Sequence, residues 1–312
     1  MLGSFSRRLR ISAYVVAGML VFGLLGVPQA RAGFILPGDS ANFAVLYEGN
    51  GANSLNINTG PIFGNIGIGD PSGSTTSNFA FNNPGTINGN VLFAGSVLLN
   101  GDNGTLNGTI TGGNANVQTD LNLLNSLSTT LGAESGTALS VALGGSGQSQ
   151  TINASAGTLD ASGNRVFTVG SFQFNNGETL IINGDAAGDS VVLNFTSGAQ
   201  FNGTIALNGI TSDQVLFNFT GGAALMGGNT LQTSTNGAVL EGVFLDPNGA
   251  MSLTHSVLDG RFFGGDSSNM QIVSGDTINA PVPAPEPSTL SLLGAGLLVM
   301  SGLVVRRKAQ LA

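Results

Sequence analysis

The 312-residue sequence predicts an all-β body, a right-handed parallel β-solenoid (β-helix) with one lateral α-helix. Three observations favour this fold class. A segment repeats after 24 residues, Asn-Gly dipeptides separate strand-length apolar pieces, and only one stretch has helical periodicity. We expect the solenoid to span residues 33–280, with an N-terminal signal helix before it and a C-terminal transmembrane helix after it.

The repeat is clearest in the second half of the chain. The nine residues 191–199 recur 24 positions later as 215–223, and six of the nine are identical. A unit of this length suits a coil of three short strands that stacks in parallel on the next coil. Like residues then lie over one another in ladders. The stacked pairs that we expect are Asn194 with Asn218 and Phe195 with Phe219.

Asn-Gly dipeptides provide the predicted turns. The chain contains eleven of them, and both residue types tolerate a positive φ. Between them lie apolar pieces of strand length, such as residues 90–94 and 242–245. Because Asn-Gly is also a hairpin signal, a sandwich of antiparallel hairpins remains an alternative architecture.

One segment departs from the strand pattern. From Asn116 to Leu131, apolar residues follow one another at spacings of four, three, three and four, which predicts an amphipathic helix. Gly132 is expected to end it. A helix with one leucine stripe would pack along the flank of the solenoid; docking of a partner is the alternative role. The apolar positions are Val117, Leu121, Leu124, Leu127 and Leu131.

The composition excludes several classes of function. The body between residues 33 and 285 holds two basic and 16 acidic residues, a formal charge of −14. Such a surface repels nucleic acid, so we expect no nucleic-acid partner. The chain has no cysteine, so disulfides and thiolate chemistry are excluded. We expect the fold to depend on core packing and backbone hydrogen bonds.

The N-terminus has the pattern of a secretory signal peptide, assigned to residues 1–32. Three arginines before residue 11 precede an apolar stretch that ends at Val27. Ala30 and Ala32 then form a small-x-small cleavage site, which would leave Gly33 as the mature N-terminus. An uncleaved signal anchor is the alternative, and both interpretations predict export.

The C-terminus combines three short segments. A proline-rich linker at residues 281–289 contains Pro285, Glu286 and Pro287, and an apolar run follows at 290–305. A basic cytoplasmic tail occupies 306–312. The run would be about 24 Å long as a helix, against about 30 Å of hydrocarbon, so the cationic side chains at its end would reach the interface by snorkelling. These side chains are Arg306, Arg307 and Lys308.

This order of motif, apolar run and basic stop resembles the PEP-CTERM sorting signal of Gram-negative bacteria. The resemblance implies that an exosortase, a membrane transpeptidase, recognises the region of Pro285, Glu286 and Pro287 and processes the tail. An ordinary C-terminal membrane helix after a proline-rich linker is the alternative. Both place the body outside the cytoplasm, because basic residues that flank a span favour the cytoplasmic side.

Short motifs in the body extend the resemblance. They look like the choice-of-anchor A domain, an exported family that is followed by one of several sorting tails and is not known for enzymes. The layout of coils, lateral helix and more coils is also similar to the ice-binding, adhesin-like solenoids of bacteria. Within that group, ice binding implies a flat, often Thr-rich face, whereas here Thr233-Ser234-Thr235 does not recur. The motifs lie at residues 42–46, 85–91, 215–219, 242–250 and 257–265.

One cluster is a candidate for catalysis. His255, Asp259, Arg261 and Asp266 bring the only histidine of the chain near carboxylates, a combination that acid-base chemistry on sugars requires. However, Asp259-Gly260 is expected to be a turn, and Arg261 is expected to pair with Asp259 at the surface. We therefore predict no enzyme and assign no catalytic residue. No cofactor or metal motif is present, although scattered aspartates leave loose Ca²⁺ binding open.

The sequence thus predicts an exported protein of the cell envelope or extracellular matrix, held by the membrane at least transiently. Its role would be structural or adhesive, with an exosortase, the membrane and exopolysaccharide as partners. The alternatives are an ice- or carbohydrate-binding module on one flat solenoid face and, third, a polysaccharide-active enzyme.

Overall fold

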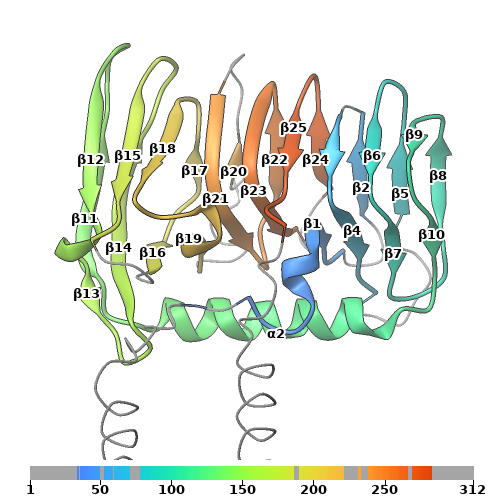
Figure 1. Cartoon of the computed structure of the whole chain (residues 1–312), viewed down its shortest axis with the longest axis horizontal. Helices are drawn as coiled ribbons and strands as arrows, with labels where there is room; N and C mark the ends of the chain where they lie inside the picture. The colour runs from blue at the N-terminus through green and yellow to red at the C-terminus, as the bar shows by residue number, and fades with distance from the viewer. Residues whose placement is uncertain are drawn as a thin grey trace, which may run out of the picture.

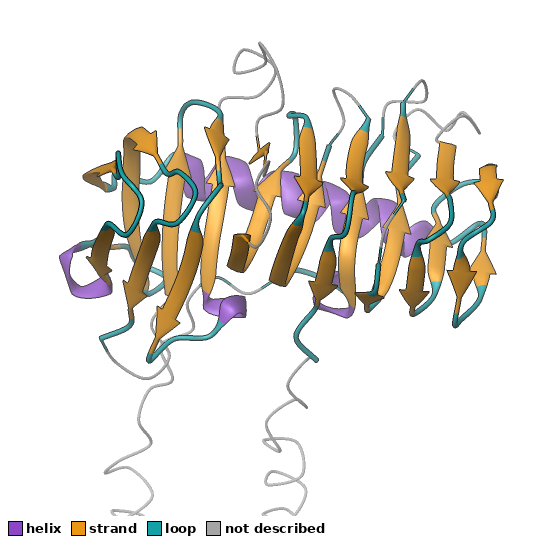
Figure 2. Cartoon of the chain, turned by 90° about the horizontal axis from the view of Figure 1, so that it is seen from above, coloured by secondary structure: helices purple, strands orange, loops and turns teal. Residues whose placement is uncertain are grey.

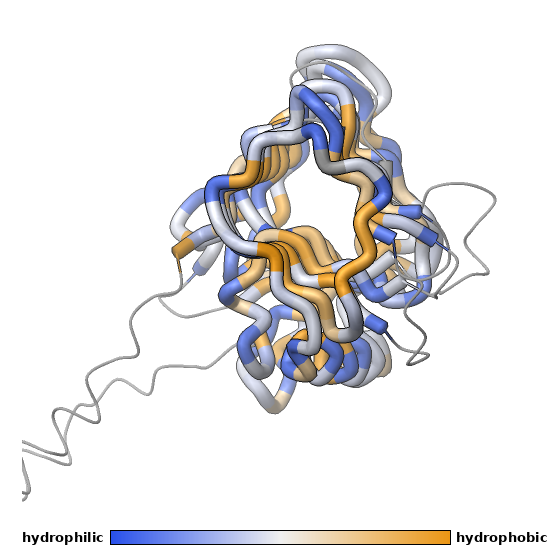
Figure 3. Tube along the Cα trace, turned by 90° about the vertical axis from the view of Figure 1, so that its right-hand side faces the viewer, coloured by the Kyte–Doolittle hydropathy of each residue, from blue (hydrophilic) through white to orange (hydrophobic). Residues whose placement is uncertain are grey.

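The computed structural model describes residues 34–282, except 35, 50–52, 59, 71–77, 186–189, 221–230, 233–237 and 266–268. The strands coil around an apolar interior and stack along one axis (Figures 1 and 3). Within the described ranges, only β13 (Thr158–Leu159) pairs antiparallel, with β14 (Asn164–Gln173); the repeated strands pair in parallel. The parallel β-solenoid is therefore confirmed, and the hairpin sandwich is excluded. The right-handed sense of the solenoid stays a prediction.

The solenoid has three faces, which we name a, b and c. Face a consists of β10 (Ile110–Thr111), β7 (Val91–Phe93), β4 (Asn65–Ile68), β1 (Phe43–Tyr47), β23 (Ser256–Gly264), β21 (Ala238–Asp246), β19 (Val215–Phe219), β16 (Ser190–Phe195), β14 and β11 (Thr137–Ala142), in this spatial order. Face b consists of β8 (Leu99–Asp102), β5 (Asn78–Phe81), β2 (Ser54–Ile57), β24 (Met270–Val273), β22 (Met251–Thr254), β20 (Leu231–Gln232) and β17 (Ala199–Gln200).

Face c joins short strands to the first halves of two long ones. It consists of β9 (Thr105–Leu106), β6 (Thr86–Asn88), β3 (Ile62–Phe63), β25 (Thr277–Asn279), the first halves of β23 and β21, and then β18 (Thr204–Asn208), β15 (Thr179–Asn183) and β12 (Ser149–Asn153). The long strands β23 and β21 cross from face c to face a, because their first halves pair on one face and their second halves on the other.

The coils do not follow one another in chain order. β1 lies in the middle of face a, between β4 and β23, and the chain then builds coils outward as far as β10. The chain next passes to β11 at the opposite end and builds coils back to β23. A seam therefore joins the first coil to the last, with Val45 opposite Phe262.

Helix α2 (Ala115–Gly132) connects the two ends and confirms the predicted helix. It runs along the solenoid (Figures 1 and 2). It begins after Asn114, whose Oδ1 accepts a hydrogen bond from the Asn116 backbone at 3.2 Å. As predicted, the helix ends at Gly132. A Cβ there would lie 2.4 Å from Thr220 Cγ2, so glycine permits close packing of the helix on the coils.

No helix among residues 34–282, in the ranges given above, is long and apolar enough to cross a membrane. The leader, with Ala30 and Ala32, and the tail from 283 onward lie outside the described residues. The signal peptide and the transmembrane segment therefore stay predictions.

Stacked phenylalanines fill part of the interior of the coils. The rings of Phe195 and Phe219 are stacked with centroids 4.7 Å apart, as the repeat predicts. Phe217 and Phe244 are stacked at 4.5 Å in the same way. These side chains are at most 1% exposed. Aromatic pairs of this kind contribute about 0.5–1.5 kcal/mol beyond the burial of their area.

A second apolar layer lies between α2 and the outer side of face a. Val117, Leu121 and Leu124 of the helix pack there against side chains such as Val192 and Leu216. Apolar burial of this kind stabilises by roughly 25 cal/mol per Å². The leucine stripe is therefore a packing surface: α2 covers face a, and no described α-helix covers face b or face c.

Glycines allow the coils to stack at a corner. A Cβ on Gly89 would lie 2.2 Å from Gly64 O, and one on Gly108 would lie 2.1 Å from Gly89 O. Neither Gly89 nor Gly108 has a positive φ. At these Asn-Gly dipeptides the glycine therefore serves close backbone approach, not the turn conformation that the sequence suggested.

Candidate functional site

The candidate catalytic cluster does not assemble in the described residues. His255 is exposed in the turn between β22 and β23, where its φ is 56°. Asp259 lies on face c, where its Oδ1 accepts a hydrogen bond from Asn279 at 2.6 Å. Arg261 is fully buried on face a, and Asp266 lies outside the described residues. The expected Asp259-Gly260 turn was wrong, because both residues belong to β23.

The expected surface pair of Arg261 with Asp259 was also wrong. Arg261 instead forms an ion pair with Asp213, with Nε 2.9 Å from Oδ1. Its Nη1 donates to the Phe43 carbonyl at 2.6 Å, and its Nη2 donates to the Pro281 carbonyl at 2.7 Å. This buried guanidinium therefore joins the start of β1, the 3₁₀ turn η3 (Ser212–Gln214) and the segment that leads to the tail.

The arginine network stabilises the seam in a way that the sequence did not reveal. The guanidinium is 1% exposed and Asp213 is 34% exposed. Removal of the arginine would leave the Phe43 and Pro281 carbonyls without their donor, and each buried group left unpaired costs about 1–3 kcal/mol. The expectation that packing and backbone hydrogen bonds alone hold the fold was therefore incomplete. The only available signal was that the body has just two arginines.

A buried carboxyl lies close to the His255 turn. Asp276 is fully buried, and its Oδ1 accepts a hydrogen bond from the Ser256 backbone at 2.7 Å. Burial raises the pKa of Asp276 to about 7, while hydrogen bonds from the backbone of Ser256 and Val273 act in the opposite direction. This group is therefore a titratable element of the corner, and it is not exposed to a substrate.

Face c carries exposed asparagine ladders. Asn183 Nδ2 donates to Asn153 Oδ1 at 2.9 Å, and Asn208 Nδ2 donates to Asn183 Oδ1 at 3.2 Å. A separate pair follows near the other end, where Asn107 Nδ2 donates to Asn88 Oδ1 at 2.9 Å. Neighbouring strands of a sheet are about 4.8 Å apart, so the ladders present amides at a regular spacing on an open surface.

Face b has a different outer row. Ala80, Asn56 and Gln271 lie opposite one another in register, followed by Ser252. This described row contains no threonine, and Thr233-Ser234-Thr235 lies outside the described residues. The ice-binding alternative therefore stays a prediction that this row of face b does not support.

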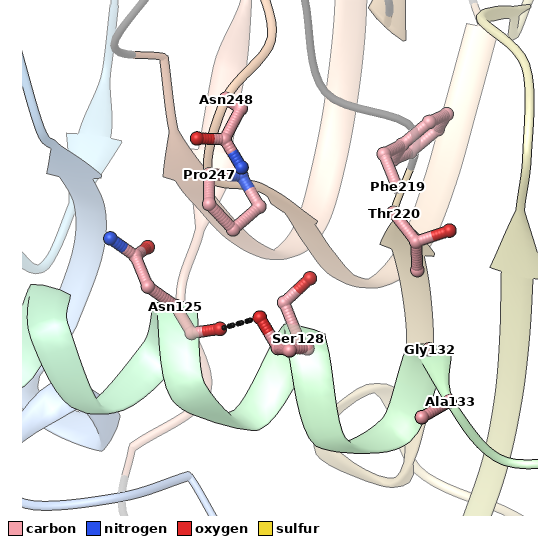
Figure 4. A pocket seen from close by; sticks show the side chains of 9 residues that line it. Asn125, Ser128, Gly132, Ala133, Phe219, Thr220, Pro247 and Asn248 are labelled. Carbon is pink, nitrogen blue, oxygen red and sulfur yellow. Dashed lines mark hydrogen bonds between the residues drawn. The ribbon is translucent and has the colours of Figure 1, made fainter.

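A polar cleft of about 530 Å³ lies between α2 and the ends of β19 and β21 (Figure 4). Asn125 and Ser128 project from the helix on one side, and Pro247 and Asn248 lie across from them. Thr129 also lines the cleft, and its Oγ1 donates a hydrogen bond to the Asn125 carbonyl at 2.9 Å. None of the residues that line the cleft is acidic or basic, so it offers no groups for acid-base chemistry.

A smaller cleft of about 330 Å³ includes Asp39 and Asp120. Asp120 Oδ1 accepts a hydrogen bond from the Asp39 backbone at 2.9 Å. Burial raises the pKa of Asp120, and the charge of Asp39 adds to this effect while its backbone N–H opposes it. Across the described part of the chain, no three His, Cys, Asp or Glu side chains come together as a metal site. Ca²⁺ binding thus has no defined ligand set here.

A family model described as a putative ice-binding-like adhesive domain matches residues 15–273, well over half of the chain. The chain belongs to this family. A second model, the PEP-CTERM protein-sorting motif, matches residues 283–308. The resemblances to the PEP-CTERM sorting signal and to the ice-binding, adhesin-like solenoids are therefore confirmed. The PEP-CTERM motif implies processing by an exosortase and export to the cell envelope or surface.

Solved structures of ice-binding proteins resemble this adhesive-domain protein. One from the Antarctic ascomycete Antarctomyces psychrotrophicus has 14% identity and a TM-score of 0.48, over 80% of this chain and 100% of that chain. Ice-binding protein 1 of Shewanella frigidimarina has 16% identity and a TM-score of 0.46, over 80% and 98%. One from an Arctic yeast has 15% identity and a TM-score of 0.45, over 83% and 98%. No curated protein matches the sequence.

Neither family description names a reaction; they name adhesion, likeness to ice-binding proteins, and sorting. Of the two clefts described above, the larger has no acidic or basic lining residue, and the smaller contains Asp39 and Asp120. The roles of Pro285, Glu286 and Pro287, of the basic stop at Arg306, Arg307 and Lys308, and of the cleavage site stay predictions, because these residues lie outside the described ranges.

Proposed function

We propose that this protein is an adhesive or structural component of the cell surface or exopolysaccharide matrix. The observation that carries the proposal is the place where the tail begins. Pro281, two residues before the matched sorting motif, bonds through its carbonyl to the buried Arg261. The sorted tail therefore leaves the domain from a fixed point at the seam, so a load on the tail reaches the middle of the solenoid.

The same geometry supports an orientation of the solenoid on the cell. Phe34 and Leu36, at the start of the described chain, pack in the apolar layer beneath α2. Arg261 contacts both Phe43 and Pro281 on the same face. With the two ends of the domain on face a, a membrane-held tail turns α2 toward the cell and leaves faces b and c directed outward.

The sorting step supplies the chemistry in this proposal. The leader at 1–32 directs export, and the run 290–305 holds the precursor in the membrane with residues 306–312 in the cytoplasm. An exosortase then acts on the linker at 281–289 that contains Pro285, Glu286 and Pro287. The body itself acts by contact and catalyses no reaction.

Two tail variants test the proposal in the native host. Replacing Pro285, Glu286 and Pro287 by alanine should leave an unprocessed, membrane-bound precursor, whereas deleting residues 285–312 should release soluble protein. Fractionation followed by gel mobility measures both, and retention of cells in the matrix measures adhesion. Processing of the alanine variant like the parent would contradict the sorting role. Unchanged cell retention after the deletion would contradict the adhesive role.

A further inference from the structure

One aromatic side chain interrupts the polar surface of face c. Phe63 is 44% exposed, and it is the only aromatic residue among the exposed large hydrophobic side chains of the described chain. It is held rigidly, since its neighbour Ile62 is fully buried and β3 pairs on both sides, with β25 and β6. An exposed ring on a rigid strand is a typical anchor for binding.

Amide side chains flank the ring on both sides. In the strand register, Asn279 lies opposite Phe63 on one side and Asn88 lies opposite it on the other. All three lie in one row across parallel strands that are about 4.8 Å apart. Both asparagines are half-buried rather than covered. The ring therefore has hydrogen-bonding groups directly on either side of it.

The row continues with fixed polar groups. Asn279 Nδ2 donates to Asp259 Oδ1 at 2.6 Å, and Asn107 Nδ2 donates to Asn88 Oδ1 at 2.9 Å. An amide nitrogen has two donor hydrogens and an ionised carboxylate has four acceptor positions, so each pair keeps groups for a ligand. The internal hydrogen bonds hold these amides in place before any ligand binds, which lowers the entropy cost of binding.

The chemistry of this row matches a sugar ring. A pyranose has an apolar face of C–H groups, which stacks on an aromatic ring, and an edge of hydroxyls, which bond to amides and carboxylates. The flat row along the solenoid axis suits an extended polymer more than a compact ligand. We infer that Phe63, Asn88, Asn279 and Asp259 form a binding subsite for a neutral polysaccharide on face c.

The charge of face c favours neutral over anionic polysaccharides. Asp259 and Glu241 lie opposite each other in β23 and β21 and make this part of face c acidic. The body has only two arginines: Arg165 pairs with Asp185 at 3.1 Å, and Arg261 is buried against Asp213. No cation is therefore left in the row to bind uronic acids or sulfates, and polyanionic chains are repelled.

This inference rests on the proposed adhesive function and names its ligand class. The full chain, purified in a polyoxyethylene detergent without a sugar headgroup, is tested by affinity gel electrophoresis. The gels contain hydroxyethyl cellulose, laminarin, dextran, galactomannan or alginate. At least one of the four neutral polymers should retard the parent, and Phe63→Ala should weaken that retardation at least tenfold. Asn279→Ala should weaken it several-fold.

Leu159→Ala is the matched control. Leu159 is also 44% exposed, but it lies on β13 beside face a, away from the row, so its replacement should leave retardation unchanged. Equal thermal unfolding of the variants shows that the coils are intact, because an exposed ring contributes little to stability. Retardation by alginate alone, by none of the neutral polymers, or equally of the parent and Phe63→Ala would overturn the inference.

The two proposals fail separately. If cells are retained in the matrix while the purified parent binds no neutral polymer, the sugar subsite is wrong and the adhesive role stands. If the parent binds a neutral polymer but deletion of the tail leaves cell retention unchanged, the adhesive role is wrong and the subsite stands.

Discussion

Asparagines form ladders in two regions of the solenoid whose surroundings are opposite. Beneath α2, Asn218 Nδ2 donates to Asn194 Oδ1 at 2.8 Å, and both side chains are at most 2% exposed. On face c, the ladder of Asn153, Asn183 and Asn208 is open to solvent apart from partial burial of Asn183. The same residue type is thus stacked by the same strand register in both places.

The difference between the ladders lies in what else the amides bind. Asn194 Nδ2 donates to the Leu131 carbonyl at 2.7 Å, and Asn218 Oδ1 accepts from Ser128 Oγ at 2.6 Å. The covered ladder therefore attaches the helix to two coils, and every partner lost there is left without water. The open ladder can exchange each hydrogen bond for one with water. Burial, not residue type, decides whether a ladder stabilises the fold or forms a surface.

The largest expected effect on stability concerns the two arginines of the body, which also differ in burial. Arg261→Ala should lower the free energy of unfolding by about 3–5 kcal/mol, because the Phe43 and Pro281 carbonyls lose their donor and the buried side chain leaves a cavity. Arg165→Ala is the control, since the Arg165 side chain is 17% exposed whereas that of Arg261 is 1% exposed, and it should cost about 1 kcal/mol or less. Urea denaturation of both variants measures the difference, and equal losses would contradict it.

Asp276→Asn tests a carboxyl that is buried beside the open faces. Because the folded-state pKa of Asp276 is raised to about 7, the folded state binds more protons than the unfolded state between pH 4 and 7. Stability from this group is full below pH 4 and is lost as the pH rises through 7. At 1.36 kcal/mol per pKa unit, the variant should gain about 3–4 kcal/mol over the parent between pH 4 and 8.

The measurement is the difference in unfolding free energy between Asp276→Asn and the parent, taken at several pH values. The amide keeps an oxygen for the Ser256 N–H, so the corner should stay intact. A difference that does not change between pH 4 and 8 would mean that this carboxyl does not titrate as described.

Asn218→Ala breaks the covered ladder. It removes a partner from Ser128 and from Asn194 in a buried place, and each buried group left unpaired costs about 1–3 kcal/mol. We expect a total loss of about 2–4 kcal/mol in chemical denaturation. A loss below about 1 kcal/mol would show that water reaches this layer and that α2 does not seal it.

Asn183→Ala makes the same change in the open ladder and should have the smallest effect. Asn153 and Asn208 can bond to water instead, so stability should change by about 0.5 kcal/mol or less. Thermal unfolding beside Asn218→Ala makes the comparison direct. If the two variants lose the same stability, burial does not separate the two ladders.

Local repetition explains how much of the fold could be predicted. The pairing of Asn194 with Asn218 follows from the 24-residue repeat, and the helix follows from its leucine spacing. The seam left no such signal, because Val45 and Phe262 are neighbours without any similarity between their segments. A non-consecutive contact of this kind depends on the closure of the whole solenoid, which a local pattern does not encode.

The expected pair of Asp259 and Arg261 was wrong because of a bend in β23 that the sequence does not show. Asp259-Gly260 was expected to be a surface turn, with Arg261 paired to Asp259. However, β23 turns from face c to face a at Gly260, where a Cβ would lie 1.8 Å from Gly242 O. The two side chains therefore belong to different faces. The exposure of Phe63 could not be predicted either, since an isolated phenylalanine in a sequence is as typical of a core as of a surface.

The connection through α2 also limits how many coils the solenoid can have. Nine strand spacings separate β10 from β11, or about 43 Å, and the helix covers about 27 Å of this with its 18 residues. One additional coil would widen the gap by about 4.8 Å, which is the rise of about three helical residues. Among the described residues, the first coil and the last coil meet at the seam in the middle of the stack. Insertion of a coil would therefore require a longer connection between β10 and β11, in α2 or in the segments that join the helix to these strands.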